Sequence, residues 1–96
     1  MYAKGKNAVG PCLVLYCRDN GRPVNRLGIT VGAKLGKAVR RNRVRRRLRE
    51  IYRTNEWRFK RGRDLVVVAR GRSVRASYWE LEKNFLNLAG KLGLLK

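Results

Sequence analysis

The chain has 96 residues, of which 25 are lysine or arginine and only six are acidic, so its formal net charge is +19. Because 44% of its residues are hydrophobic, we expect one folded domain over residues 1–96 rather than a disordered basic tail. A charge of this size repels itself unless a polyanion neutralises it, which leaves nucleic acid, an anionic membrane surface or an acidic protein as candidate partners. No apolar run is long enough to span a bilayer or to act as a secretory signal, so we expect a cytoplasmic protein.

The first third of the chain predicts two strands. Residues 1–10 show little apolar periodicity and predict a loop, whereas residues 12–18 and 26–31 alternate as strands do. Asp19, Asn20 and Gly21 favour a turn, so we expect the two strands to pair as an antiparallel hairpin. Cys12 and Cys17 should point to opposite faces of the first strand, which excludes a disulfide and predicts two structural thiols. Two thiols without any histidine are too few ligands for a zinc site.

The segment from Lys37 to Asn55 predicts an amphipathic helix. It contains neither glycine nor proline, and Val44, Leu48 and Ile51 recur at helical spacing. Its polar face is almost wholly cationic and is interrupted only by Glu50. Like charges at these spacings destabilise an isolated helix by about 0.2 to 0.5 kcal/mol per pair, so we infer that the face binds a ligand. The alternative is a solvated charged face, but such faces usually mix both signs.

The rest of the chain predicts a basic turn, a strand and a closing helix. Residues 58–62 are the turn, and the uniform apolar run of residues 64–69 favours a central strand buried on both faces. Ser77 and Glu80 have the spacing of a capping box at the start of a helix. The apolar stripe of that helix comprises Leu81, Phe85, Leu88 and Leu92. The order of strand, strand, helix, strand and helix predicts an α+β fold.

The side chains needed for catalysis are scarce in this chain. It has no histidine to act as a general base, its acids are scattered, and it lacks the spacing of a phosphate-binding loop. Any catalysis must therefore lie in a partner. Arginine outnumbers lysine by 17 to 8, and because guanidinium groups both grip phosphates and stack on bases, this excess favours nucleic acid over a membrane.

One ordered motif runs from Lys34 to Glu50 and reads KLGKAVRRNRVRRRLRE. It resembles the signature of the bacterial ribonuclease P protein family, in which an Arg-Asn-Arg core follows Lys, Gly, Ala and Val and precedes a basic run ending in Arg-Glu. The resemblance extends to residues 26–31, to residues 64–70 and to the closing helix. It implies a single-domain α/β sandwich, with a mixed sheet of about four strands, a C-terminal helix, and the arginine-rich helix as a left-handed crossover between parallel strands.

The resemblance also implies a function. In this family the protein is the accessory subunit of an endoribonuclease, and an RNA subunit holds the Mg²⁺ ions and hydrolyses the bond between the 5′ leader and the tRNA. The implied partners are that RNA and precursor tRNA, with neither DNA nor a membrane. No cofactor is implied for the protein alone, and no residue is implied to be catalytic or to bind a metal. The alternatives are a ribosomal-type rRNA-binding protein and a stand-alone RNA-cutting protein.

The family's binding residues can be placed on matching positions of this chain. For the leader-binding cleft, Tyr16 matches an aromatic residue of the first strand, and Tyr2 matches one of an N-terminal helix. For both tyrosines the alternative is a structural role, for Tyr16 as a core aromatic with its hydroxyl at the rim. Because the chain starts at the end of that N-terminal helix, we expect this wall of the cleft to be largely absent. The residues expected to contact the RNA subunit lie in or beside the motif helix: Lys34, Lys37, Arg41, Asn42, Arg43, Arg45, Arg46, Arg49 and Arg53.

Overall fold

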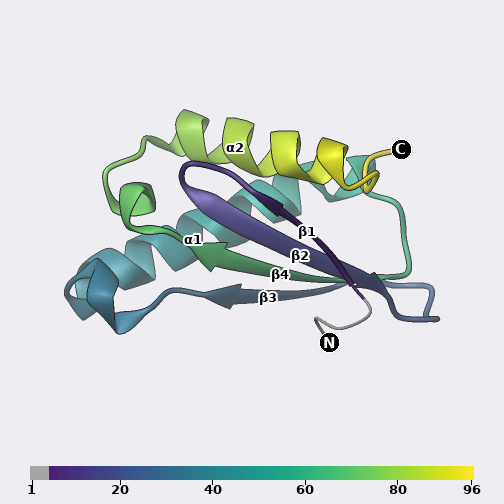
Figure 1. Cartoon of the computed structure of the whole chain (residues 1–96), viewed down its shortest axis with the longest axis horizontal. Coiled ribbons are helices and arrows are strands. Elements are labelled where there is room, and N and C mark those ends of the chain that lie inside the picture. Colours follow the sequence, from purple (N-terminus) through teal and green to yellow (C-terminus); the bar gives the residue numbers. More distant parts are fainter. Residues whose placement is uncertain (1–4) are drawn as a thin grey trace.

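The computed structural model describes residues 5–96, in which two helices cover one face of a four-stranded sheet (Figure 1). The strands are β1 (Lys6–Val9), β2 (Leu13–Asp19), β3 (Arg26–Thr30) and β4 (Arg63–Ala69), and the helices are α1 (Ala38–Asn55) and α2 (Tyr78–Lys91). Short 3-10 helices are η2 (Ala33–Leu35), η3 (Glu56–Arg58) and η4 (Gly71–Val74). The predicted α+β sandwich, with its mixed sheet, its arginine-rich crossover helix and its C-terminal helix, is confirmed.

The predicted hairpin between the first two apolar strands is wrong. The order across the sheet is β1-β2-β4-β3, with β4 antiparallel to β2 and parallel to β3. As the most uniformly apolar strand, β4 takes a central position where both of its edges are hydrogen-bonded, and β3 is displaced to the sheet edge. The turn residues are used differently, since Asn20 N donates to Gly62 O at 3.0 Å and ties the loop after β2 to the start of β4.

The loop predicted for residues 1–10 is also wrong where β1 forms. β1 pairs antiparallel with β2 over its whole length, from Lys6 opposite Cys17 to Val9 opposite Val14. A short edge strand can be polar and exposed because only one of its edges needs a partner, so apolar alternation does not reveal it. The position predicted for Tyr2 lies outside the described residues.

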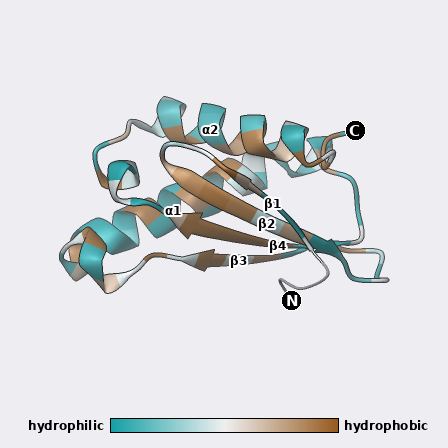
Figure 2. Cartoon of the chain, viewed as in Figure 1, coloured by the Kyte–Doolittle hydropathy of each residue, from teal (hydrophilic) through white to brown (hydrophobic). Residues whose placement is uncertain are grey.

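The core lies between the sheet and the helices. Leu13 and Leu15 of β2 and Leu65 and Val67 of β4 are at most 1% exposed and face the helices. Figure 2 shows hydrophobic residues concentrated in the central strands, whereas much of α1 is hydrophilic. The helices contribute their predicted stripes, of which these members are buried: Val44, Leu48, Ile51, Leu81, Phe85 and Leu88.

Only one of the two hydrogen bonds of the predicted capping box forms at the start of α2. Ser77 Oγ accepts from Glu80 N at 3.1 Å, but the Glu80 carboxylate turns to Cys12 Sγ at 3.6 Å and to Arg72 Nε at 4.0 Å. Both cysteines are buried without a disulfide, and burial raises the pKa of each thiol. The prediction that they face opposite sides of a strand is wrong, because Cys12 precedes β2 and turns toward α2. Cys17, in register with Leu13 and Leu15, faces the same helical layer.

The face of the sheet away from the helices is open. Burial on both faces was predicted for β4, but its alternate residues Val66 and Val68 are only half-buried, as is Val14 beside them in β2. The prediction is wrong because both helices pack on the same side: α2 on β1 and β2, and α1 on β3. The domain therefore presents two separate surfaces, the outer face of α1 and the open face of the sheet. Within residues 5–96, no helix is both long and apolar enough to cross a membrane.

Candidate RNA interface

The outer face of α1 is a line of cations. Val44, Leu48 and Ile51 turn toward the sheet and are at most 2% exposed, so the opposite side of the helix meets solvent. An 18-residue helix is about 27 Å long, enough to follow several phosphates of a nucleic-acid strand. The residues that this face exposes are Asn42, Arg43, Arg46, Arg49 and Arg53.

The nine residues predicted to contact the RNA subunit lie in η2, in α1 or at the N-cap of α1. Lys34 lies in η2, Lys37 is the N-cap of α1 and the other seven lie within α1. Arg41 and Arg45 are half-buried at the flanks, and the other seven residues are exposed. Asn42 Oδ1 accepts from Arg45 Nη1 at 3.1 Å, which fixes the direction of that guanidinium. The fold therefore gathers the cations of the motif along one side of the molecule.

The one acidic residue on this helix face is internally paired. Arg53 Nη2 lies 2.6 Å from Glu50 Oε1, and this pairing raises the pKa of Arg53. The first turn has no acidic residue and no side-chain cap, although a helix N-terminus carries partial positive charge that acids normally offset. An anion near Lys37 and Arg40 would offset the positive charge of these side chains and the partial positive charge of the helix N-terminus. This end of α1 is therefore suited to a phosphate.

A cation that the sequence did not single out joins this face. Arg75, Arg40 and Arg43 line a hollow of about 310 Å³ together with Val74. The segment carrying Arg75 is held against α1, since Arg47 Nη1 donates to Ala76 O at 3.2 Å. Arg75 lies outside the motif and outside any periodic pattern, so only the tertiary structure identifies it.

The open face of the sheet has an apolar centre. Strand pairing places Tyr16 beside Val66, and Val66 beside Gly28 of β3. The next row joins Val14 to Val68. Tyr16 is half-buried and belongs to this open face, because its neighbours in β2, Leu15 and Cys17, face the helices. Glycine at position 28 leaves this row without a side chain beyond Val66.

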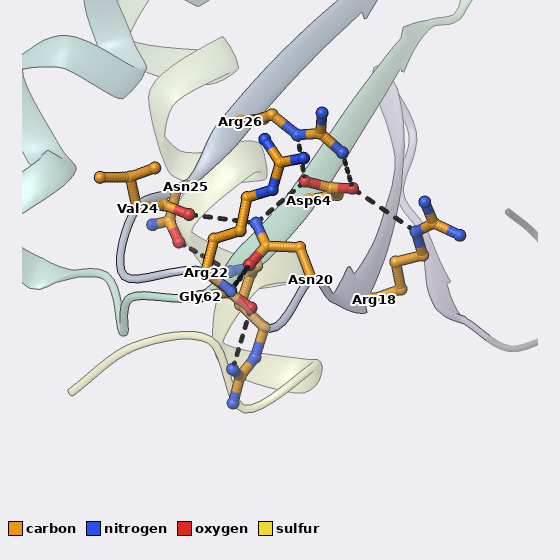
Figure 3. Close-up of polar contacts among 9 residues, drawn as sticks. Arg18, Asn20, Arg22, Val24, Asn25, Arg26, Gly62 and Asp64 are labelled. Carbon is orange, nitrogen blue, oxygen red and sulfur yellow. Dashed lines mark hydrogen bonds and ion pairs between the residues drawn. The ribbon is translucent and has the colours of Figure 1, made fainter.

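One end of the open face carries a charged cluster around Asp64 (Figure 3). Arg26 donates to both carboxylate oxygens, from Nε at 2.9 Å and from Nη2 at 2.8 Å, and Asn20 Nδ2 donates at 3.0 Å. Arg18 Nε lies 3.5 Å from the same carboxylate. These partners, of which Arg26 has the largest effect, hold the pKa of Asp64 well below its usual range.

The Asp64 cluster fixes two guanidinium groups beside the apolar centre. The Asp64 side chain is 9% exposed, whereas those of Arg18 and Arg26 are 40% and 53% exposed. The carboxylate is thus the buried anchor, and the arginines remain accessible to a phosphate. Sequence reasoning missed the cluster because its members lie on three strands, and the mistaken hairpin separated β2 from β4.

The acidic residues do not assemble a metal site. Asp64 is occupied by Arg26, Asn20 and Arg18, and no three acidic or cysteine side chains within residues 5–96 lie close enough to hold a metal ion.

The fold and these two surfaces define a small, basic nucleic-acid-binding protein. A family model described as Ribonuclease P matches residues 1–93. The chain belongs to the ribonuclease P protein family.

Relatives with similar sequences match this chain over most of their own length. The "Ribonuclease P protein component" of Alkaliphilus oremlandii is 43% identical over 95 residues, covering 99% of this chain and 83% of the relative. The protein of the same name from Clostridium botulinum strain Langeland is 42% identical over 95 residues, covering 98% and 86%. Membership of this family places the chain in tRNA 5′ processing, within an endoribonuclease complex, and does not favour a ribosomal protein.

Solved structures of RNase P proteins have a similar fold. An RNase P protein from Thermotoga maritima aligns with a TM-score of 0.84 at 37% identity, covering 90% of this chain and 84% of that one. The Staphylococcus aureus RNase P protein gives a TM-score of 0.89 at 26% identity, with coverages of 99% and 87%.

Proposed function

We propose that this chain is the protein subunit of ribonuclease P and that it binds two RNA segments on its two surfaces. The outer face of α1 binds the catalytic RNA subunit, and the open face of the sheet binds the 5′ leader of precursor tRNA. The observation that carries the proposal is the one-sided α1, whose apolar stripe is buried while its cations are exposed.

The α1 surface suits a folded RNA. Each cation placed against a phosphate releases condensed counterions and adds about 0.7 to 0.9 to the slope of log affinity against log salt. The exposed cations of the predicted set supply such contacts without any need for base recognition: Lys34, Lys37, Arg43, Arg46, Arg49 and Arg53. Arginine can also stack on unpaired bases, which a lysine-rich surface could not do as well.

The open face suits a single strand. Its half-buried valines and Tyr16 offer an apolar floor for bases, and stacking on an aromatic ring contributes about 1 to 3 kcal/mol per base with little choice of sequence. Arg18 and Arg26, held by Asp64, would meet the phosphates. Weak sequence preference is what an enzyme acting on many precursor tRNAs requires. Binding the leader on the protein would favour precursor over mature tRNA.

The chemical step belongs to the RNA partner. The chain has no histidine, and Asp19, Glu50 and Asp64 are each paired with an arginine, so these three carboxylates are not arranged with one another for acid and base work. We propose that the RNA subunit holds the Mg²⁺ ions and hydrolyses the phosphodiester bond. The protein contributes positioning and charge neutralisation.

Cleavage of precursor tRNA by three mixtures tests the proposal: protein alone, ribonuclease P RNA alone, and the two together, all with Mg²⁺. We expect no cleavage by the protein alone and faster cleavage by the mixture than by the RNA alone. Cleavage by the protein alone would assign catalysis to this chain. Failure to stimulate the RNA at moderate salt would favour a general rRNA-binding protein instead.

A further inference from the structure

Trp57 is a large aromatic side chain left in solvent at the end of α1. It lies in η3, directly after the helix, and is 69% exposed. Burying an aromatic residue removes about 150 to 250 Å² from water, which stabilises the state in which the ring is buried. Phe59, two residues later, is buried in the core and stacks on Phe85 with ring centroids 5.5 Å apart. The chain therefore buries one ring here and presents the other.

The exposed indole borders two hollows. One has a volume of about 530 Å³, and its walls include Pro23 and Val24 from the loop before β3. The other, of about 310 Å³, is lined by Trp57 with Arg58, Leu95 and Lys96. The indole is thus accessible to a flat ligand and has apolar walls beside it.

The loop that forms the wall is held in place. Asn25 Nδ2 donates to Tyr52 Oη at 3.2 Å and to Lys60 O at 3.0 Å, and Asn25 Oδ1 accepts from Arg63 N at 2.9 Å. Asn20 Nδ2 donates to Val24 O at 3.0 Å. These bonds fix the spacing between the loop and the end of α1, so the hollow is preformed.

The charges around the indole are mostly positive. Arg53, Arg61 and Lys96 line the larger hollow with a single acid, Glu56. The Arg58 guanidinium lies 5.2 Å from the centroid of the indole ring. Arg53 is engaged by Glu50, but within residues 5–96 neither Arg61 nor Lys96 forms an ion pair. These two cations can therefore meet a phosphate.

We propose that Trp57 and the hollow beside it form a binding site for one unpaired nucleotide of an RNA strand. The base stacks on the indole, and its phosphates meet Arg61 and Lys96. An indole ring with a guanidinium over one of its faces is the kind of surface on which bases stack, whereas an acidic peptide would gain from the charge alone. Because Arg53 belongs both to the cationic face of α1 and to the hollow, an RNA that follows α1 reaches the site. The proposal rests on the proposed function only in this last respect.

Trp79 provides a matched control in the same chain. It is 76% exposed, but it lies in the first turn of α2, where Tyr78 meets it edge-on with ring centroids 6.2 Å apart. The Trp79→Phe variant leaves Trp57 as the sole indole, and Trp57→Phe leaves Trp79. Each variant of the full chain is titrated with a short single-stranded oligoadenylate, and indole fluorescence is measured. We expect Trp57 fluorescence to be quenched at saturation and Trp79 fluorescence to stay unchanged.

The affinities of protein variants for oligoadenylate distinguish the contribution of base stacking from that of charge. Trp57→Ala should weaken oligoadenylate binding about 5- to 150-fold, whereas Trp57→Phe should keep most of the affinity and Trp79→Ala should keep all of it. Trp57→Ala should not change the salt dependence, because stacking releases no counterions. Arg61→Gln with Lys96→Gln should lower the slope of log affinity against log salt by about 1.4. Since Trp57 is exposed, unfolding midpoints should be unchanged in all of these variants.

Three results would overturn the site. They are an unquenched Trp57, equal quenching of both tryptophans, and quenching of Trp57 by polyglutamate as strong as that by oligoadenylate. The last result would assign the hollow to acidic peptides. Docking of the RNA subunit on α1 is tested separately by Arg46 and Arg49 variants, so either proposal can fail while the other stands.

Discussion

Replacing two arginines on the outer face of α1 tests whether this face binds RNA. Arg46 and Arg49 are both exposed and point away from the buried stripe. In the variant Arg46→Gln/Arg49→Gln, two phosphate contacts are lost, so the slope of log affinity against log salt should fall by about 1.4 to 1.8. When the salt concentration rises about fourfold, both proteins should lose affinity for ribonuclease P RNA. The loss should be about 7- to 12-fold smaller for the variant than for the wild type.

The fold should tolerate this change. Glutamine and arginine have similar helix propensities, and removing like charges three residues apart relieves about 0.2 to 0.5 kcal/mol of repulsion. The unfolding midpoint should thus stay the same or rise slightly.

The assay is equilibrium binding of the RNA at several salt concentrations, with Lys83→Gln/Lys91→Gln as the control. The control removes the same charge from exposed positions of α2. We expect its slope to match that of the wild type. An unchanged slope in the α1 variant, or an equal fall in the control, would show that the RNA binds elsewhere.

Three further predictions concern the fold beneath the two surfaces. Leu48 is 2% exposed, so Leu48→Ala should destabilise the domain by about 2 to 5 kcal/mol and lower the thermal midpoint by about 8 °C or more. Val39 is 71% exposed, so the control variant Val39→Ala should change stability by less than about 0.5 kcal/mol. Ser77→Ala removes the cap of α2 and should cost about 1 kcal/mol in chemical unfolding; no loss would mean that water replaces the hydroxyl. Asp64→Asn should lower stability at neutral pH. Because the folded pKa of Asp64 is depressed, this difference from the wild type should shrink as the pH falls below the ordinary value of 3.8, and a constant difference would contradict the ion-pair account.

The sequence predicted α1 and its cationic face well because both are local properties. A stripe at helical spacing and an unbroken run of arginines can be read without knowing any long-range contact. The capping of α2 by Ser77 is local in the same sense, and it too was confirmed.

The strand pairing could not be predicted in this way. Asp19, Asn20 and Gly21 favour a turn wherever they occur, but which strands lie side by side depends on how the whole sheet packs. β4 competes for the centre because it can be hydrogen-bonded on both edges, and the chain between β3 and β4 is long enough to hold a helix. β1 gave no signal, since an exposed edge strand needs no apolar alternation.

The exposure of one face of β4 was not predicted. Its run of five apolar residues suggested burial on both faces, yet Val66 and Val68 are half-buried on the open face. The apolar side chains of this face are therefore partly open to solvent. The same failed pairing hid the Asp64 cluster, whose members come together only in the folded sheet. Trp57 follows the end of α1 and belongs to no periodic pattern, so the sequence alone did not distinguish it from a core residue.

We propose that one small domain uses separate surfaces for its RNA subunit and for the leader. It is tested most directly by the ratio of affinities for precursor and mature tRNA, measured on complexes assembled with ribonuclease P RNA. Tyr16→Ala should lower this ratio about 5- to 150-fold, while Tyr16→Phe should largely preserve it. Arg46→Gln/Arg49→Gln should weaken assembly with the RNA subunit but leave the ratio of the assembled complex unchanged. A ratio that responds to the α1 variant and not to Tyr16→Ala would contradict the assignment of the two surfaces.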